Sequence, residues 1–148
     1  IPPTGVLKNN IETYIQRFKS FSDTVKITAG NIVNIGVDFT ILPAPDVNVN
    51  DALVDCFIAL KRIFITENTN FGSSLVLPNY VTRLQSLEKV RSVVNFKFTN
   101  INQNQSNRSY SAYDFKIESN VQNGILSFPE DVCWELKYPN FDIVGRTA

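Results

Sequence analysis

An alternating stretch at residues 32–42 limits the folds open to this chain more than any other feature. Apolar side chains occupy every second position there: Val33, Ile35, Val37, Phe39 and Ile41. Successive side chains of a β-strand point to opposite faces, so the stretch predicts a strand with one buried face and one polar face. Strands of this kind are typical of antiparallel sheets. A second alternation at residues 94–98 predicts another strand of the same sheet.

Two amphipathic segments separate those strands. The first, at residues 48–65, carries an apolar stripe at three- and four-residue steps: Leu53, Cys56, Phe57, Leu60, Ile63 and Phe64. Either Asn48 or Asn50 can cap the helix that this stripe predicts. A short extended piece follows at residues 75–77, and Pro78 suits the first position of a helix that we expect to reach Val90.

The first part of the chain predicts one more helix and one more strand. Thr4 is a suitable N-cap for an amphipathic helix at residues 4–20. Residues 25–28 alternate as a short strand, and a turn at residues 29–31 would pair it with residues 32–42 as a hairpin. The sequence therefore predicts an α+β fold: a two-layer αββααβ unit with its helices on one face of a small, mostly antiparallel sheet.

The composition changes abruptly at residue 100. Residues 100–109 are mostly Asn, Gln and Ser, which bury too little apolar surface to offset the entropy of ordering and so predict a long mobile loop. Beyond it, extended pieces at residues 113–117, 125–128 and 132–137 predict a β-hairpin-rich tail. We expect an α/β unit at residues 1–99 and a loop and tail at residues 100–148. Because isolated hairpins are marginal in water, the tail should pack on that unit or on a partner chain.

The composition also excludes several classes of function. The chain contains no histidine, which excludes Ser-His and Cys-His nucleophiles, His-containing metal sites and imidazole acid–base catalysis. Lys+Arg and Asp+Glu both number 14, so no net charge attracts nucleic acid. No apolar run is long enough for a membrane helix. We expect no enzyme, no nucleic-acid partner and no membrane insertion.

The sulfur-containing residues give two further expectations. Cys56 and Cys133 each fall inside an apolar pattern, which favours two buried free thiols, with a disulfide between them as the alternative. The chain contains no Met, even at its first position, which indicates a segment of a longer polypeptide or a processed product.

Two groups of carboxylates are candidates for chemistry. The first surrounds the start of the helix predicted at residues 48–65, where acidic side chains complement the helix dipole: Asp46, Asp51 and Asp55. The second lies in the tail, and we interpret it as exposed surface charge: Glu130, Asp131 and Glu135. A carboxylate-dependent hydrolase is the alternative that these residues leave open.

Four aromatic residues of the tail are candidate interface residues: Trp134, Tyr138, Phe128 and Phe141. In a short β tail such residues either pack in the domain's own core or anchor a partner, where Trp and Tyr are enriched. The sequence leaves both interpretations open. Together with the Asn-rich loop, these aromatics also suggest an alternative function, a host-surface or glycan-binding module.

Four segments carry a resemblance to a known family. They are the strand at residues 31–41, the helix at residues 51–64, the sequence Phe71-Gly72-Ser73-Ser74-Leu75-Val76-Leu77, and the helix at residues 80–90 with the following Val93-Val94-Asn95-Phe96. Together they resemble the C-terminal region of the baseplate J-like family, the wedge proteins of contractile-tail phages and related injection machines. The step into the last strand reads Arg91-Ser92-Val93, without the glycine usual in that family.

The remaining segments are most similar to the wedge proteins of T4-type phages. The helix at residues 7–20, the Asn-rich loop and the sequence at residues 136–143 carry this part of the resemblance. The resemblance implies a structural role in the virion tail, after assembly in the host cytoplasm. In that family two copies join a different wedge subunit, six wedges form a ring around the hub, and rearrangement of the ring triggers sheath contraction. It implies a homodimer with other wedge subunits as partners, and no enzymatic activity or cofactor.

Overall fold

The computed structural model describes residues 3–19, 25–67 and 70–148, and the chain divides into two compact units, Ile1–Asn31 and Ile32–Ala148. It is a mixed α+β fold with a mostly antiparallel sheet, as the sequence predicts. We expected one part at residues 1–99 and another at residues 100–148. The second unit contains residues from both parts, because strands from before and after residue 100 share one sheet.

The first unit contains helix α1 (Gly5–Gln16). Thr4 caps it as predicted, since its hydroxyl accepts a hydrogen bond from the Leu7 amide at 3.2 Å. The helix ends before the predicted limit at Ser20, a residue that lies outside the described part of the chain. None of the residues of α1 is buried, and the rings of Tyr14 and Phe18 contact each other on its apolar side.

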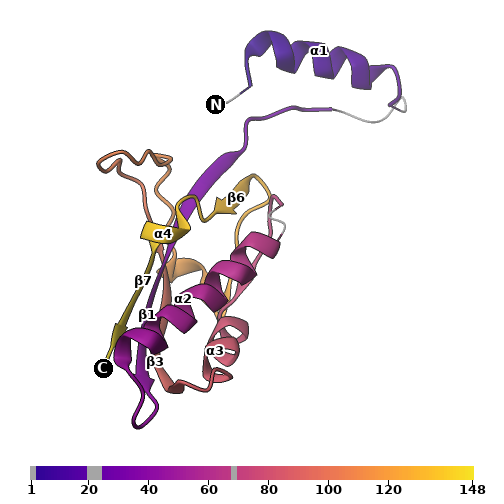
Figure 1. Ribbon diagram of the computed structural model, residues 1–148. Helices are drawn as coiled ribbons and strands as arrows, with labels where there is room; N and C mark the ends of the chain where they lie inside the picture. Colours follow the sequence, from indigo (N-terminus) through magenta and orange to yellow (C-terminus); the bar gives the residue numbers. More distant parts are fainter. Residues whose placement is uncertain (1–2, 20–24, 68–69) are drawn as a thin grey trace. The chain divides into compact units, whose positions relative to one another are not determined.

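Strand β1 (Asn31–Pro43) is the centre of the second unit (Figure 1). It pairs antiparallel with β3 (Val90–Asn100) and parallel with β7 (Ile143–Thr147), and it also neighbours β6 (Val132–Glu135). The β3 and β7 pairings overlap along β1, so they occupy its two opposite edges. The predicted hairpin with residues 25–28 is wrong: residues 25–30 form no strand, and the strands that pair with β1 in the described part of the chain are β3, β6 and β7.

Helices α2 (Val49–Thr66) and α3 (Leu77–Gln85) cover the apolar face of this sheet. Helix α2 packs against β7, α3 packs against β3, and the two helices contact each other. All five alternating apolar residues of β1 are buried, in a core that also contains residues of both helices: Val33, Ile35, Val37, Phe39 and Ile41. Asn48 caps α2 by accepting from the Asn50 amide at 2.9 Å. Helix α3 ends five residues earlier than predicted, because Val90 already pairs with Pro43 in the sheet.

The tail contributes both a hairpin and strands of the main sheet. Strands β4 (Val121–Gln122) and β5 (Ile125–Leu126) form an antiparallel hairpin, and β5 also pairs with β2 (Leu75–Val76). Asn123 and Gly124 make its turn with φ of 54° and 77°, a left-handed geometry that Asn-Gly favours. A 3₁₀ turn (Glu118–Asn120) precedes β4, and the short helix α4 (Pro139–Asp142) leads into β7.

Candidate functional site

Helix α2 has two apolar faces. Its inner face is buried in the core: Ala52, Cys56, Ala59, Leu60 and Phe64. Three more apolar residues recur on the opposite side and remain exposed, Val54 at 53%, Ile58 at 42% and Ile65 at 68%. Residues four and seven apart lie on the same side of a helix. The solvent side of a surface helix is normally polar, so this outer stripe marks a surface that another molecule can cover.

Two hollows flank the outer stripe of α2. One, of about 230 Å³, lies on the β7 side and is lined by Phe39, Leu53, Val54, Phe57 and Gly145. The other, of about 310 Å³, lies on the α3 side and is lined by Asp55, Ile58, Ala59, Arg62, Arg83 and Leu87. The stripe is therefore a ridge with a groove on each side. Helices commonly pack by placing the ridges of one helix into the grooves of another.

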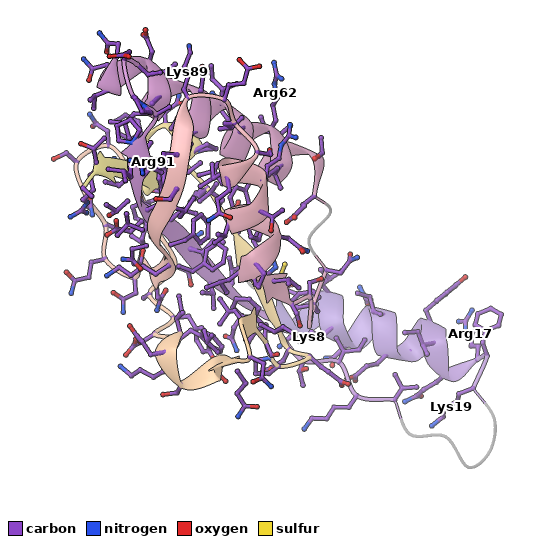
Figure 2. The ribbon with its side chains drawn as sticks, turned by 90° about the horizontal axis from the view of Figure 1, so that it is seen from below. Lys8, Arg17, Lys19, Arg62, Lys89 and Arg91 are labelled. Carbon is purple, nitrogen blue, oxygen red and sulfur yellow. The ribbon has the colours of Figure 1, made fainter. Side chains whose placement is uncertain are left out.

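The charges of α2 are separated along its length. Asp51 and Asp55 lie in the first half, and Lys61 and Arg62 lie in the second. Asp55 is paired with Lys89 at 3.3 Å, and the Lys61 ammonium donates to the Asn140 side chain at 3.0 Å. Both contacts are exposed, so they hold these charges only weakly. Arg62 projects from the helix surface (Figure 2).

A third, more polar pocket, of about 330 Å³, lies beside α3. It is lined by Glu67, Ser73, Ser74, Val76, Asn79, Tyr80 and Trp134. The Tyr80 hydroxyl donates to both carboxylate oxygens of Glu67, at 2.9 and 3.0 Å. Burial, reinforced by this carboxylate, raises the pKa of Tyr80 well above its ordinary value, so the phenol stays a neutral donor. The buried indole nitrogen of Trp134 has no partner among the described residues.

The four aromatic residues singled out in the tail have different surroundings. Trp134 is only 3% exposed and packs edge-on against Phe64, and Phe128 is buried and stacked on Phe115. Trp134 and Phe128 therefore belong to this chain's own core and are not exposed to a partner. Tyr138 is half-buried against Tyr110.

Phe141 is the exposed member of the four. Its side chain is 60% accessible, and the Arg108 guanidinium lies 4.4 Å from the centre of its ring. A cation held over an aromatic face orders both side chains, although the gain at an exposed site is small. Phe141 therefore remains a candidate interface residue, and it is separate from the outer stripe of α2.

Two buried polar side chains fasten the Asn-rich loop to the sheet. Asn34 accepts from the Ser111 amide at 2.6 Å and donates to Glu135 at 3.2 Å. Asp142 accepts from the Tyr110 hydroxyl at 2.6 Å and from the Tyr138 amide at 3.1 Å. Burial and the bond to Asp142 raise the pKa of Tyr110 to about 12. Residues 101–112 contain no strand or helix, as expected of a loop, but both of their ends are anchored.

The carboxylates have structural surroundings in this fold. Asp51 lies in the first turn of α2, Asp46 adopts a positive φ in the preceding turn, and Glu135 accepts the bond from Asn34. Glu130 and Asp131 are exposed. No cluster of three or more metal-binding side chains occurs among the described residues. No local pattern signals the roles of Asn34 and Asp142, because their partners lie far away along the chain.

Both cysteines are free. Cys56 is buried as expected, and this burial, with a smaller effect of the Asp55 carboxylate, raises the pKa of its thiol to about 11. Cys133 is half-buried, less enclosed than the sequence predicts. Cys56 therefore stays a neutral thiol at physiological pH and acts as a small apolar core residue.

Comparisons with known proteins add no family assignment. No protein-family model matches the sequence, and the search of curated proteins found no match. Within the described ranges, no helix is both long and apolar enough to cross a membrane.

Proposed function

We propose that this chain is a structural subunit of a phage baseplate wedge, located in the virion tail. It contributes to ring assembly and to the rearrangement that triggers sheath contraction. The resemblance of residues 31–96 to the baseplate J-like family supports this role. The observation that carries it is the outer stripe of α2, an apolar surface on the solvent side of an otherwise well-packed unit. In this proposal the chain self-associates, contacts other wedge subunits and has no enzymatic activity.

The outer stripe supports assembly because of the energy that covering it would release. Burying apolar surface contributes about 25 cal/mol per Å² removed from water. Val54, Ile58 and Ile65 project from one rigid helix that the core holds in place, so little conformational entropy is lost when they are covered. The same side chains give no benefit to an isolated domain in water.

Self-association is tested by sedimentation velocity over a series of concentrations. We expect the dimer fraction of the wild-type chain to rise with concentration. Ile58→Glu should remain monomeric, because dimerisation would bury the new carboxylate without a partner. Thr82→Glu, on the exposed side of α3, is the matched control and should behave as wild type. A chain that stays monomeric throughout and binds no other wedge subunit would contradict the proposal.

A glycan-binding role is the second candidate, and the polar pocket beside α3 favours it. Sugars are bound by carboxylate, amide and hydroxyl groups beside an aromatic wall, and this pocket combines Glu67, Asn79 and Ser74 with Tyr80. The pocket volume of about 330 Å³ is at the lower end of the range for small-molecule sites.

Glycan-array binding and adsorption to host cells test this second candidate. We expect Asn79→Ala to weaken glycan binding by about tenfold, since a lost hydrogen bond costs about 1 kcal/mol or more. Asn95→Ala, an exposed amide on β3, is the matched control and should leave binding unchanged. If the wild-type chain binds neither the glycan array nor host cells, the glycan-binding role is ruled out.

A further inference from the structure

We propose that the outer edge of β7 binds an extended segment of a partner protein. The segment joins the sheet as a further strand and inserts one apolar side chain into the hollow between β7 and α2. This inference goes beyond the proposed baseplate role and does not depend on it. Two observations carry it: β7 has a single strand neighbour among the described residues, and an apolar hollow of about 230 Å³ lies next to it.

Strand β7 lies at the margin of the sheet (Figure 1). In the described part of the chain it pairs with β1 alone, residues 143–147 against residues 37–41. Three successive residues of β7 are exposed: Val144, Gly145 and Arg146. The N–H and C=O groups on the outer side of an edge strand can pair with another chain. An extended main chain is the ligand that matches such a row of alternating donors and acceptors.

The opposite margin of the sheet, β3, is better protected. The Asn100 side chain donates to the Tyr113 carbonyl at 3.3 Å, so residues near Tyr113 lie against the end of β3. Lys97 is an exposed charge on that strand, and charged side chains on an edge strand oppose pairing with another chain. On β7 the charged residue is Arg146, and its guanidinium is bound to Asp38 at 3.1 Å. The β7 edge is therefore the more open of the two.

The hollow beside β7 selects an apolar side chain. It is lined by apolar residues only: Phe39, Leu53, Val54, Phe57 and Gly145. An apolar cavity of about 150 Å³ can hold a benzene molecule, so this hollow has room for a Leu or Phe side chain. Residues opposite each other on neighbouring strands point to the same face of a sheet. The partner residue opposite Gly145 would therefore point toward α2 and into the hollow.

A second copy of β7 does not fit this hollow. The residues of β7 that point toward α2 are Gly145 and the residues two positions on either side of it, Ile143 and Thr147. Ile143 is buried in the core of its own copy, Gly145 has no side chain, and Thr147 is polar. None of the three can fill an apolar hollow in another copy. The occupant is therefore a strand of different sequence, which we assign to a partner protein.

Lys61 adds a charge preference to the site. It follows Phe57 by four positions, on the same side of α2, and its ammonium lies 6.0 Å from the centre of the Phe57 ring. The ammonium also donates to Asn140 in α4, the helix that leads into β7. Lys61 therefore lies where β7 begins, with a neutral hydrogen-bond partner. Strand residues two positions apart share a face, so we expect the partner to carry Asp or Glu two positions from its apolar residue.

Titration of the whole chain with a peptide, followed in amide ¹H–¹⁵N NMR spectra, tests the site. The probe is the acetylated and amidated peptide Thr-Glu-Thr-Leu-Thr-Glu-Thr, which can place Leu opposite Gly145 and Glu near Lys61 in either strand direction. We expect saturable shifts at residues 143–147 and at the residues that line the hollow. Replacing Leu of the peptide by Ser should weaken binding at least about tenfold, because the hollow then stays unfilled.

Two N-methylated versions of the peptide test main-chain pairing. One carries the methyl groups on the Leu and Glu amides, the other on the Thr amides. Successive residues of a strand direct their N–H groups to opposite edges. We therefore expect one version to bind and the other not to bind. Binding by both versions, or by neither, would contradict the addition of a strand to β7.

Lys61→Glu tests the charge preference. This variant should bind the Glu-containing peptide about fivefold more weakly than wild type and should prefer a peptide with Lys in place of Glu, as expected of an exposed ion pair. Arg62→Glu is the matched control, because Arg62 lines the hollow on the other side of α2 and should leave peptide binding unchanged. Circular dichroism checks that both variants keep the fold.

The outcomes separate this inference from the proposed function. Saturable shifts in β7 with the expected side-chain, main-chain and charge preferences would support the added strand. No shift at a peptide concentration of about 1 mM would overturn it. Shifts of the β7 amides with the concentration of the chain itself, without peptide, would show that a second copy occupies this edge and would also overturn it. The baseplate role is tested separately by sedimentation and by binding to other wedge subunits.

Discussion

Replacing Trp134 by alanine is expected to lower the free energy of unfolding by about 3–5 kcal/mol. The side chain is 3% exposed, packs against Phe64 at a centroid distance of 6.0 Å, and belongs to the same core cluster as β1 and α2. Truncation would leave a cavity that the surrounding strands and helices can close only in part. Urea denaturation followed by circular dichroism measures the loss as a lower midpoint with an unchanged slope.

Trp134→Phe is the informative control. It keeps an aromatic ring against Phe64 and removes the indole N–H, which has no partner among the described residues. We expect this variant to lose less than about 1.5 kcal/mol, the usual limit for a volume-similar apolar replacement. Equal stability of Trp134→Ala and the wild type would show that β6 is not part of the core. Because Trp134→Ala damages the fold, loss of glycan binding in that variant would say nothing about a binding site, whereas Asn79→Ala can test one.

Gly145→Ala is expected to lower the free energy of unfolding by about 1–3 kcal/mol. Gly145 lies opposite Phe39 in the β1–β7 pair, and the outer end of the Phe39 ring lies next to it. A Cβ at this position would approach the Cε2 and Cε1 atoms of the ring to 2.7 and 2.8 Å and its Cζ atom more closely still. Either the ring or the strand would have to shift, and the packing of Phe39 under α2 would be disturbed.

Two companion variants test the cause of this loss in the same denaturation experiment. Gly5→Ala, where nothing lies within 4 Å of the added methyl group, should stay within about 0.5 kcal/mol of wild type. Phe39→Leu should destabilise the wild-type chain but cost less in the Gly145→Ala background, because the smaller side chain makes room for the methyl group. Strictly additive losses would show that the two side chains do not collide.

The sequence predicts the parts of the fold that depend on local periodicity. The alternation in β1 identifies its buried face correctly, and the caps at Thr4 and Asn48 are where the pattern of polar residues places them. Residues 25–28 alternate in the same way, yet they form no strand. Alternation shows that a segment can form a strand, but it does not show whether a neighbouring strand has a free edge. Here β1 is paired with strands that lie far away along the chain, β3, β6 and β7.

The candidate site is harder to predict for a related reason. Val54, Ile58 and Ile65 are apolar positions within a helix whose core stripe is also apolar, so only their exposure in the folded structure distinguishes the outer stripe from the inner one. Trp134 shows the converse, since the same residue type serves cores and interfaces and only the fold reveals that it is buried. Burial of Asn34 and Asp142 depends on partners brought together by the tertiary structure.

The parallel pairing of β1 with β7 affects the order in which this unit can form. Strand β7 follows every other element along the chain, and β1 precedes every other element of its unit. During synthesis, one edge of the central strand therefore stays incomplete until the ribosome has delivered the whole unit. Folds dominated by such non-local pairings form slowly, and exposed strand edges favour aggregation in the meantime. A nascent chain of this protein should benefit from chaperone protection, and truncation before β7 should give insoluble material.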